Sequence, residues 1–137
     1  MSVAKRAFID TNVIVYLASG DARKADRSEK ILAAGGVLSV QVLNEYVSVA
    51  RRKLALSWTE TREVIAAVKS ACEIVPSSVE AQAAAMRISE TSQLSIYDAS
   101  IVAAALEAGC DTLLSEDMQH GQKFETLSIV NPYRSLK

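Results

Sequence analysis

The fold is decided by residues 7–14, Ala7-Phe8-Ile9-Asp10-Thr11-Asn12-Val13-Ile14, in which a short apolar run ends at an acidic residue. Three apolar residues are too few for a helix, so the run at residues 7–9 predicts a short buried strand. A helix is expected soon afterwards, over residues 13–17. Similar short runs recur at residues 37–40, 73–75, 112–114 and 127–130. The chain therefore alternates between short strands and helices.

The segments between these strands carry the spacing and the end signals of helices. Gly35-Gly36 and Gly109 are stop signals that follow apolar-periodic stretches. Helices are expected over residues 25–34, 41–54, 59–71, 79–91 and 96–108. Strands joined through helices form parallel sheets covered on both faces, and uniformly apolar strands agree with that arrangement. We therefore expect one α/β domain, residues 1–137, with a central parallel sheet of about five strands.

Composition narrows the function classes. The chain has 15 basic and 16 acidic residues among 137, a net charge of −1, and 50% hydrophobic residues, which is an ordinary globular composition. The charge balance argues against a protein that holds nucleic acid by bulk positive charge, although a nuclease with an acidic site remains open. No apolar run approaches the ~18 residues that span a membrane, and the first residues lack a signal-peptide pattern. A cytoplasmic protein without a membrane partner is expected.

Four acidic residues are expected to meet at one edge of the sheet. Asp10 follows the first strand, Asp117 follows the fourth, and Glu45 and Asp98 lie beside the apolar faces of their helices. Ligand sites of such sheets lie beyond the carboxyl ends of the strands, where the strand order reverses. Converging carboxylates repel one another, and oxygen ligands select a hard ion, Mg²⁺ or Mn²⁺. One or two such ions could activate a water for phosphodiester hydrolysis.

Each acid also has an ordinary structural explanation. Asp10 could cap the helix that follows it, and Asp98 could complete a capping box with Ser95. Glu45 could be a surface residue and Asp117 a loop residue. Only the joint placement of all four favours a metal site.

Three segments resemble motifs of the PIN-domain ribonucleases. Residues 8–14, Phe-Ile-Asp-Thr-Asn-Val-Ile, are similar to the opening motif of that family. Residues 94–105, Leu-Ser-Ile-Tyr-Asp-Ala-Ser-Ile-Val-Ala-Ala-Ala, resemble its third acidic motif and are close to VapC-type toxins of type II toxin–antitoxin systems. Residues 113–117, Leu-Leu-Ser-Glu-Asp, resemble the fourth motif, and Glu45 fits the second acidic position. The resemblance extends over essentially the whole chain.

The resemblance implies a three-layer α/β/α fold and an endoribonuclease dependent on Mg²⁺ or Mn²⁺. Asp10, Glu45, Asp98 and Asp117 would be the catalytic, metal-binding acids. Asn12 and Ser115 would be supporting residues that orient carboxylates or water, and Glu116 and Thr11 are further candidates beside them. The family also implies an RNA substrate, an antitoxin protein and a homodimer. Apolar residues of the helices at 12–18, 25–34 and 41–56 are candidates for those protein contacts.

Other interpretations remain to be weighed. The chain could be a PIN-fold module that binds or processes RNA outside a toxin–antitoxin system. A flap-type DNA nuclease needs insertions for which 137 residues leave no room. A receiver-like domain with Asp10 as phosphoacceptor would expect a lysine after a late strand, where Asn131-Pro132 stands. A non-catalytic binding module would cleave no RNA.

Overall fold

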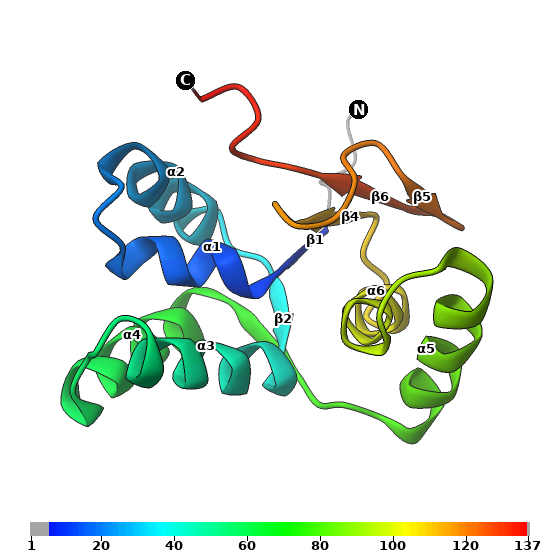
Figure 1. The fold of residues 1–137 in the computed structure, drawn as a ribbon, viewed down its shortest axis with the longest axis horizontal. Helices are drawn as coiled ribbons and strands as arrows, with labels where there is room; N and C mark the ends of the chain where they lie inside the picture. Colours follow the sequence, from blue (N-terminus) through cyan, green and yellow to red (C-terminus); the bar gives the residue numbers. More distant parts are fainter. Residues whose placement is uncertain (1–5, 137) are drawn as a thin grey trace.

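A twisted six-stranded sheet is the centre of the molecule in the computed structural model, which describes residues 6–136. The spatial order of the strands is β3-β2-β1-β4-β6-β5 (Figure 1). The strands are β1 (Ala7–Ile9), β2 (Val37–Ser39), β3 (Glu73–Val75), β4 (Thr112–Leu114), β5 (Lys123–Phe124) and β6 (Leu127–Val130). All neighbours are parallel except β5, which pairs antiparallel with β6. The α/β fold with a mostly parallel sheet is confirmed.

Each α-helix begins at a side chain that caps its first turn. The helices are α1 (Thr11–Val15), α2 (Ala22–Ala33), α3 (Val40–Arg52), α4 (Trp58–Ala71), α5 (Val79–Ser92) and α6 (Ile96–Glu107), and a 3-10 turn η1 (Tyr16–Ala18) extends α1. The N-cap residues are Asp10, Asp21, Ser39, Ser57, Ser78 and Ser95. In every case the side-chain oxygen accepts a backbone N–H that has no partner within its helix.

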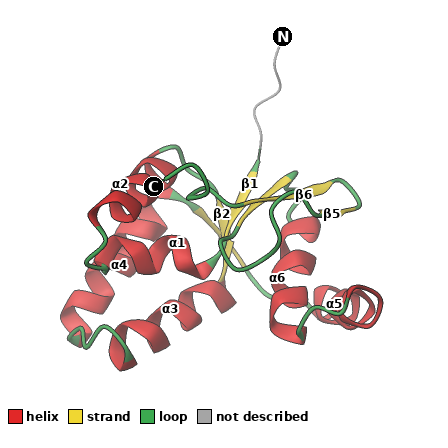
Figure 2. Ribbon diagram, turned by 45° about the horizontal axis from the view of Figure 1, so that its top comes forward, coloured by secondary structure: helices red, strands yellow, loops and turns green. Residues whose placement is uncertain are grey.

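The helices form one layer on each face of the sheet. Helices α1 to α4 lie on one side and α5 and α6 on the other (Figure 2). The strands between the layers supply the centre of the core, where Phe8, Leu38 and Leu113 are fully buried. This is the expected three-layer arrangement. No helix within residues 6–136 has the length and apolar character needed to cross a bilayer.

The structure differs from the sequence-based expectations at several element ends. The strand β5 was not predicted, and it makes the sheet mixed, with six strands instead of about five. Val40 begins α3 instead of ending β2, because Ser39 caps the helix one residue earlier. The second helix starts at Ala22, three residues before the expected start, because Asp21 caps it. The first helix starts at Thr11, two residues earlier than expected, because Asp10 caps it, and it ends at Val15, where it tightens into η1.

The sheet order creates a switch point beside β1. From β1 the chain moves to β2 and β3 on one side, whereas β4 and β6 lie on the other. Helices that leave neighbouring strands at such a point diverge and open a crevice outside the carboxyl ends of the strands. Asp10 directly follows β1 and Ser115 directly follows β4, so both residues stand at this crevice.

Candidate active site

An open cleft of about 300 Å³ lies at the switch point, and all four sequence-predicted acids line it. Its walls come from the end of β1, from α3, from the first turns of α1 and α6, and from the loop after β4. The lining residues are Asp10, Thr11, Asn12, Glu45, Ser48, Val49, Tyr97, Asp98, Ile101 and Asp117. The structure therefore brings together carboxylates that are more than 100 positions apart in the chain.

Asp10 is the most buried acid of the cleft. It is 6% exposed, and its carboxylate accepts the Thr11 N–H at 2.7 Å and the Ser115 hydroxyl at 2.8 Å. Burial raises the pKa of Asp10 to about 6, the two hydrogen bonds oppose that rise, and the charges of Glu45 and Asp117 add to it. The capping role expected for Asp10 and its place at the cleft thus coexist.

Glu45 is held from two directions on α3. The Thr11 hydroxyl donates to its Oε2 at 2.7 Å, and the Gln41 amide donates to its Oε1 at 3.0 Å. Thr11 therefore links the end of β1 to α3 through a side-chain hydrogen bond. These bonds fix the carboxylate at the cleft wall without neutralising its charge.

Asp98 lies in the first turn of α6, and its backbone N–H donates to Ser95 Oγ at 3.1 Å. Within residues 6–136 no hydrogen bond reaches its carboxylate, so the reciprocal half of the expected capping box is absent. Partial burial, followed by the charges of Asp117 and Glu45, raises the pKa of Asp98. The carboxylate is thus at the cleft with its acceptor capacity unused.

Asp117 and the supporting residues complete the cleft. The Asn12 amide donates to Asp117 Oδ2 at 2.7 Å, and this bond joins α1 to the loop after β4. Ser115 is fully buried behind the cleft, where its hydroxyl holds Asp10. Each of the two residues thus donates a hydrogen bond to one of the cleft acids.

Glu116 lies outside the cleft although it adjoins Asp117. It forms an ion pair with Lys24 at 2.6 Å and accepts a hydrogen bond from the Tyr16 hydroxyl. Burial alone would raise the pKa of Glu116, but the hydrogen bonds from Lys24 and Tyr16 outweigh that effect and lower it. Of the two consecutive acids, only Asp117 lines the cleft.

The donor set of the cleft suits a hard divalent cation. All four charged groups are carboxylates, and mutual repulsion contributes to the raised pKa values of Asp10 and Asp98. As the side chains stand, no three acidic, histidine or cysteine residues of the described chain are arranged around one ion. Mg²⁺ does not require such a cage, because it commonly keeps several waters and takes one or two carboxylates from the protein.

Several residues of the site escaped the sequence-based prediction, among them Ser48, Val49 and Ile101 of the lining. Gln41 supports Glu45 from one turn earlier on α3, which an i,i+4 search from Glu45 could have found. Tyr97 lines the cleft and is 72% exposed. It immediately precedes Asp98 in the sequence, but nothing in the pattern distinguishes it from a core aromatic.

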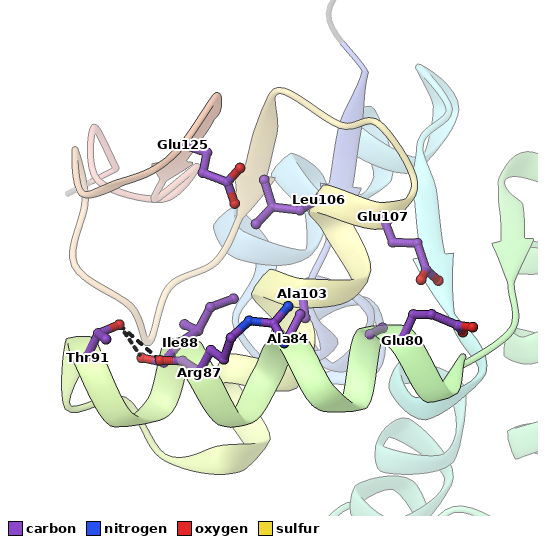
Figure 3. A pocket seen from close by; sticks show the side chains of 10 residues that line it. Glu80, Ala84, Arg87, Ile88, Thr91, Ala103, Leu106, Glu107 and Glu125 are labelled. Atoms are coloured by element: carbon purple, nitrogen blue, oxygen red, sulfur yellow. Dashed lines mark hydrogen bonds between the residues drawn. The ribbon is translucent and has the colours of Figure 1, made fainter.

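A second hollow, of about 490 Å³, lies between α5 and α6 and contains none of the predicted site residues. Figure 3 shows Arg87 and Ile88 of α5 facing Leu106 of α6, with Glu125 from the turn between β5 and β6 above them. It combines an apolar floor with acidic groups at its margin. Its position on the outer helix layer separates it from the acidic cleft.

The large apolar side chains exposed to solvent are elsewhere than expected. In residues 6–136 they are Val40, Trp58, Val79, Met86, Ile96 and Tyr97. None falls in the helical ranges 12–18, 25–34 and 41–56. Val40 and Tyr97 line a hollow of about 520 Å³ that shares Glu45 and Ser48 with the acidic cleft. Exposed apolar surface therefore borders the candidate active site.

Comparisons with known proteins agree with this geometry. The family model of the PIN domain matches residues 7–123. Sequence comparison with curated proteins gives no significant match.

Several solved structures share the fold. A toxin–antitoxin complex from Klebsiella pneumoniae superposes with a TM-score of 0.71 at 20% identity, covering 93% of this chain and 98% of that one. VapC20 of Mycobacterium tuberculosis, a sarcin–ricin loop cleaving toxin, gives 0.61 at 20% identity, with coverages of 81% and 89%. FitAcB from Neisseria gonorrhoeae gives 0.64 at 18% identity, with coverages of 93% and 99%. At such identities the likeness establishes a common fold.

Proposed function

This chain belongs to the PIN-domain family, and from that premise we propose that it is a metal-dependent endoribonuclease that acts as the toxin of a toxin–antitoxin pair. The observation that carries the proposal is the gathering of Asp10, Glu45, Asp98 and Asp117 at one cleft. Asp10 is buried there beside other carboxylates with no basic side chain lining the cleft, an arrangement that favours a bound cation. The likeness to the VapC20 toxin and to toxin–antitoxin complexes supports the same class.

The proposed cofactor is Mg²⁺ or Mn²⁺, one or two ions, held by the four acids. An ion bound there would supply Lewis acidity and would lower the pKa of a bound water below that of bulk water. The chain's own part is to hold the carboxylates in place before substrate arrives: Ser115 fixes Asp10, Thr11 fixes Glu45, and Asn12 fixes Asp117. Asp98 keeps its acceptor atoms free for a water or a ligand.

An RNA strand at the cleft meets positive charge at the end of α3. Arg52 donates to Ser48 Oγ at 3.3 Å, and Ser48 lines the cleft. Arg51 and Lys53 flank Arg52 on the exposed end of the same helix. A few such contacts can hold phosphates beside an acidic pocket in a protein whose net charge is −1.

The proposed protein partners are an antitoxin and a second copy of the chain. The structural neighbours include toxin–antitoxin complexes, which supports an antitoxin. The exposed apolar residues beside the cleft, Val40 and Tyr97, lie at the starts of α3 and α6 and support a protein contact there. The alternative is a PIN-fold module that binds or processes RNA without an antitoxin.

Substitution of single acids tests the proposal. Asp10→Asn and Asp98→Asn are expected to lower RNA cleavage at least about 100-fold, because each removes a charge that would hold the ion. EDTA should abolish cleavage by the wild type and Mg²⁺ should restore it. Cleavage is measured on labelled total RNA by gel electrophoresis, and folding by circular dichroism.

Asp26→Asn is the matched control, since Asp26 is an exposed acid on α2 that pairs with Lys30 and should not affect cleavage. Full cleavage by Asp10→Asn, in a folded protein, would refute the metal-site mechanism. RNA binding without metal-dependent cleavage by the wild type would favour the non-catalytic module. Growth arrest on expression, lost in Asp98→Asn, would support the toxin assignment.

A further inference from the structure

The segment that carries Asp117 is also bonded to α2 and η1, on the side that faces away from the cleft. Residues 115–118 follow β4, and each makes a separate contact. Ser115 donates to Asp10 and accepts the Met118 N–H at 3.4 Å, and Met118 is buried. Glu116 is the one member of the segment whose acidic side chain is directed away from the cleft, toward α2 and η1.

Glu116 contacts two polar groups, the Lys24 ammonium and the Tyr16 hydroxyl, which also contact each other. Lys24 Nζ lies 2.6 Å from its Oε2, the Tyr16 hydroxyl donates to its Oε1, and Lys24 Nζ donates to that hydroxyl at 3.0 Å. The side chains of Lys24 and Glu116 are only 29% and 23% exposed. Because the three groups are bonded to one another and largely shielded from solvent, they are held more rigidly than the two members of an isolated surface ion pair.

Two aromatic rings, those of Tyr16 and Tyr133, pack against the Lys24 ammonium group. Lys24 Nζ lies 4.6 Å from the centre of the Tyr16 ring and 5.6 Å from that of Tyr133. The two rings pack edge to face at 4.9 Å, and the hydroxyl of Tyr133 is hydrogen-bonded to buried Ser28 at 2.6 Å. The ammonium group is thus restricted by two rings as well as by Glu116.

The helical segment formed by α1 and η1 binds both Glu116 and Asp117. Asn12 and Tyr16 are four residues apart, and the Tyr16 backbone N–H bonds to the Asn12 carbonyl oxygen. Asn12 binds Asp117, while Tyr16 binds Glu116. Any shift of the loop relative to this helix would therefore strain both bonds together.

We infer that Glu116, Lys24 and Tyr16 form a clamp that positions Asp117 for divalent-metal binding, with Glu116 itself outside the metal's coordination. The inference rests on the proposed nuclease function. The three residues act through Asp117, so they are positioning residues. Partners that orient a metal ligand typically change metal affinity or activity 10–100-fold when they are lost.

The experiment compares the metal requirement of clamp variants. Glu116→Gln, Lys24→Met and Tyr16→Phe are each expected to raise the Mg²⁺ concentration for half-maximal cleavage about tenfold. The Mn²⁺ dissociation constant, measured by electron paramagnetic resonance without RNA, should rise in parallel. In an Asp117→Asn background, Glu116→Gln should add no further change. Lys24→Arg, which keeps the cation, should largely restore the wild-type requirement.

Glu73→Gln is the matched control. Glu73 also forms an ion pair, with Arg6 at 3.0 Å, but at the start of β3, the opposite end of the sheet from the cleft. Its loss should affect stability alone and leave the metal requirement unchanged. All assays are performed well below each variant's Tm, so that partial unfolding does not contribute.

Two results would overturn the clamp. The first is that all three clamp variants need the same Mg²⁺ concentration for half-maximal cleavage as Glu73→Gln does. The second is complete loss of metal binding in Glu116→Gln with no effect of Lys24→Met and Tyr16→Phe, which would make Glu116 a ligand. Wild-type protein that binds Mn²⁺ without cleaving RNA would refute only the nuclease, because the clamp is still measured by Mn²⁺ affinity. Wild-type protein that binds no Mn²⁺ would refute both.

Discussion

Asp10 combines burial, hydrogen bonding and like-charge repulsion in one residue. Its pKa rises from 3.8 to about 6 because burial and the nearby acids outweigh two hydrogen bonds. Above that pH the ionised carboxylate destabilises the metal-free native state, by about 3 kcal/mol if one pKa unit corresponds to about 1.4 kcal/mol. The same charge is what a cation would bind, so the site opposes folding until it is occupied.

Asp10→Asn should therefore stabilise the metal-free protein near neutral pH while abolishing cleavage. The wild-type carboxyl is protonated in the native state below about pH 6 and in the unfolded state only below about pH 4, so its contribution to stability is lost as the pH rises through that window. The gain of Asp10→Asn should be about 1–3 kcal/mol at pH 7 and should disappear near pH 4. Urea unfolding in EDTA at both pH values measures it. An equal effect at both pH values would contradict the explanation.

At the scale of elements, the strands and helices were predicted better than their ends. Short, mainly apolar runs predicted β1, β3, β4 and β6 at the residues observed and β2 within one residue, because buried parallel strands have a distinctive composition. The two-residue β5 escaped because Lys123-Phe124 is too short to form a pattern, and its pairing with β6 is determined by the turn between them. The start of α2 was missed because its first turn is polar and only the capping Asp21 marks it.

In the candidate site, too, the features that follow from local sequence and strand order were predicted, and those that depend on tertiary contacts were not. That the four acids share one cleft followed from strand order, since carboxyl ends of parallel strands meet at one edge. The motif resemblance already favoured Asp117 over Glu116 as the site acid, but the partners of Glu116 could not be predicted, because Lys24 belongs to α2 and Tyr16 to η1. Contacts across 92 and 100 positions are tertiary, and no local pattern records them.

The entry into β2 is sensitive to side-chain size. A Cβ added at Gly36 would lie 2.7 Å from the Cδ1 atom of buried Ile9 and 3.1 Å from the Ala7 carbonyl oxygen. Gly36→Ala should force β1 and β2 apart and lower the free energy of unfolding by about 1–3 kcal/mol. Gly20→Ala is the control, because no atom lies within 4 Å of its added Cβ, and it should be neutral or slightly stabilising. Thermal unfolding of both variants is the measurement, and equal Tm values would contradict the close approach.

At the scale of the whole molecule, charge and apolar surface are distributed unevenly around the sheet. Four of the 16 acids line one cleft, which leaves a slight excess of base elsewhere in a protein of net charge −1. Exposed apolar residues stand at the starts of α3 and α6, where Val40 and Tyr97 line a hollow beside that cleft, and at the start of α5, shortly after Ser77 of the same hollow. The edge of the sheet that carries the acids is therefore bordered by exposed apolar surface, which is typical of a protein–protein contact.

Disruption of this face should make the proposed homodimer monomeric. Val79 is 82% exposed at the start of α5, so Val79→Asp should not disturb folding but should place an unpaired charge in a buried contact. Light scattering after size exclusion should show a dimer for the wild type and a monomer for Val79→Asp. Trp58→Gln is the control, because α4 and α5 lie on opposite sides of the molecule (Figure 1). An unchanged dimer in Val79→Asp would exclude this face as the contact.

Trp58 gives the molecule an optical property that depends on one hairpin. It is the sole tryptophan, is 50% exposed at the start of α4, and has the guanidinium groups of Arg51 and Arg62 at 4.6 and 5.8 Å from its ring. Its fluorescence therefore reports the surroundings of the α3–α4 hairpin and responds little to the core. Because two cations flank the ring, an anionic quencher such as iodide would be concentrated beside it and a cationic one repelled. The emission of this protein is thus a local sensor of anything that approaches the basic end of α3.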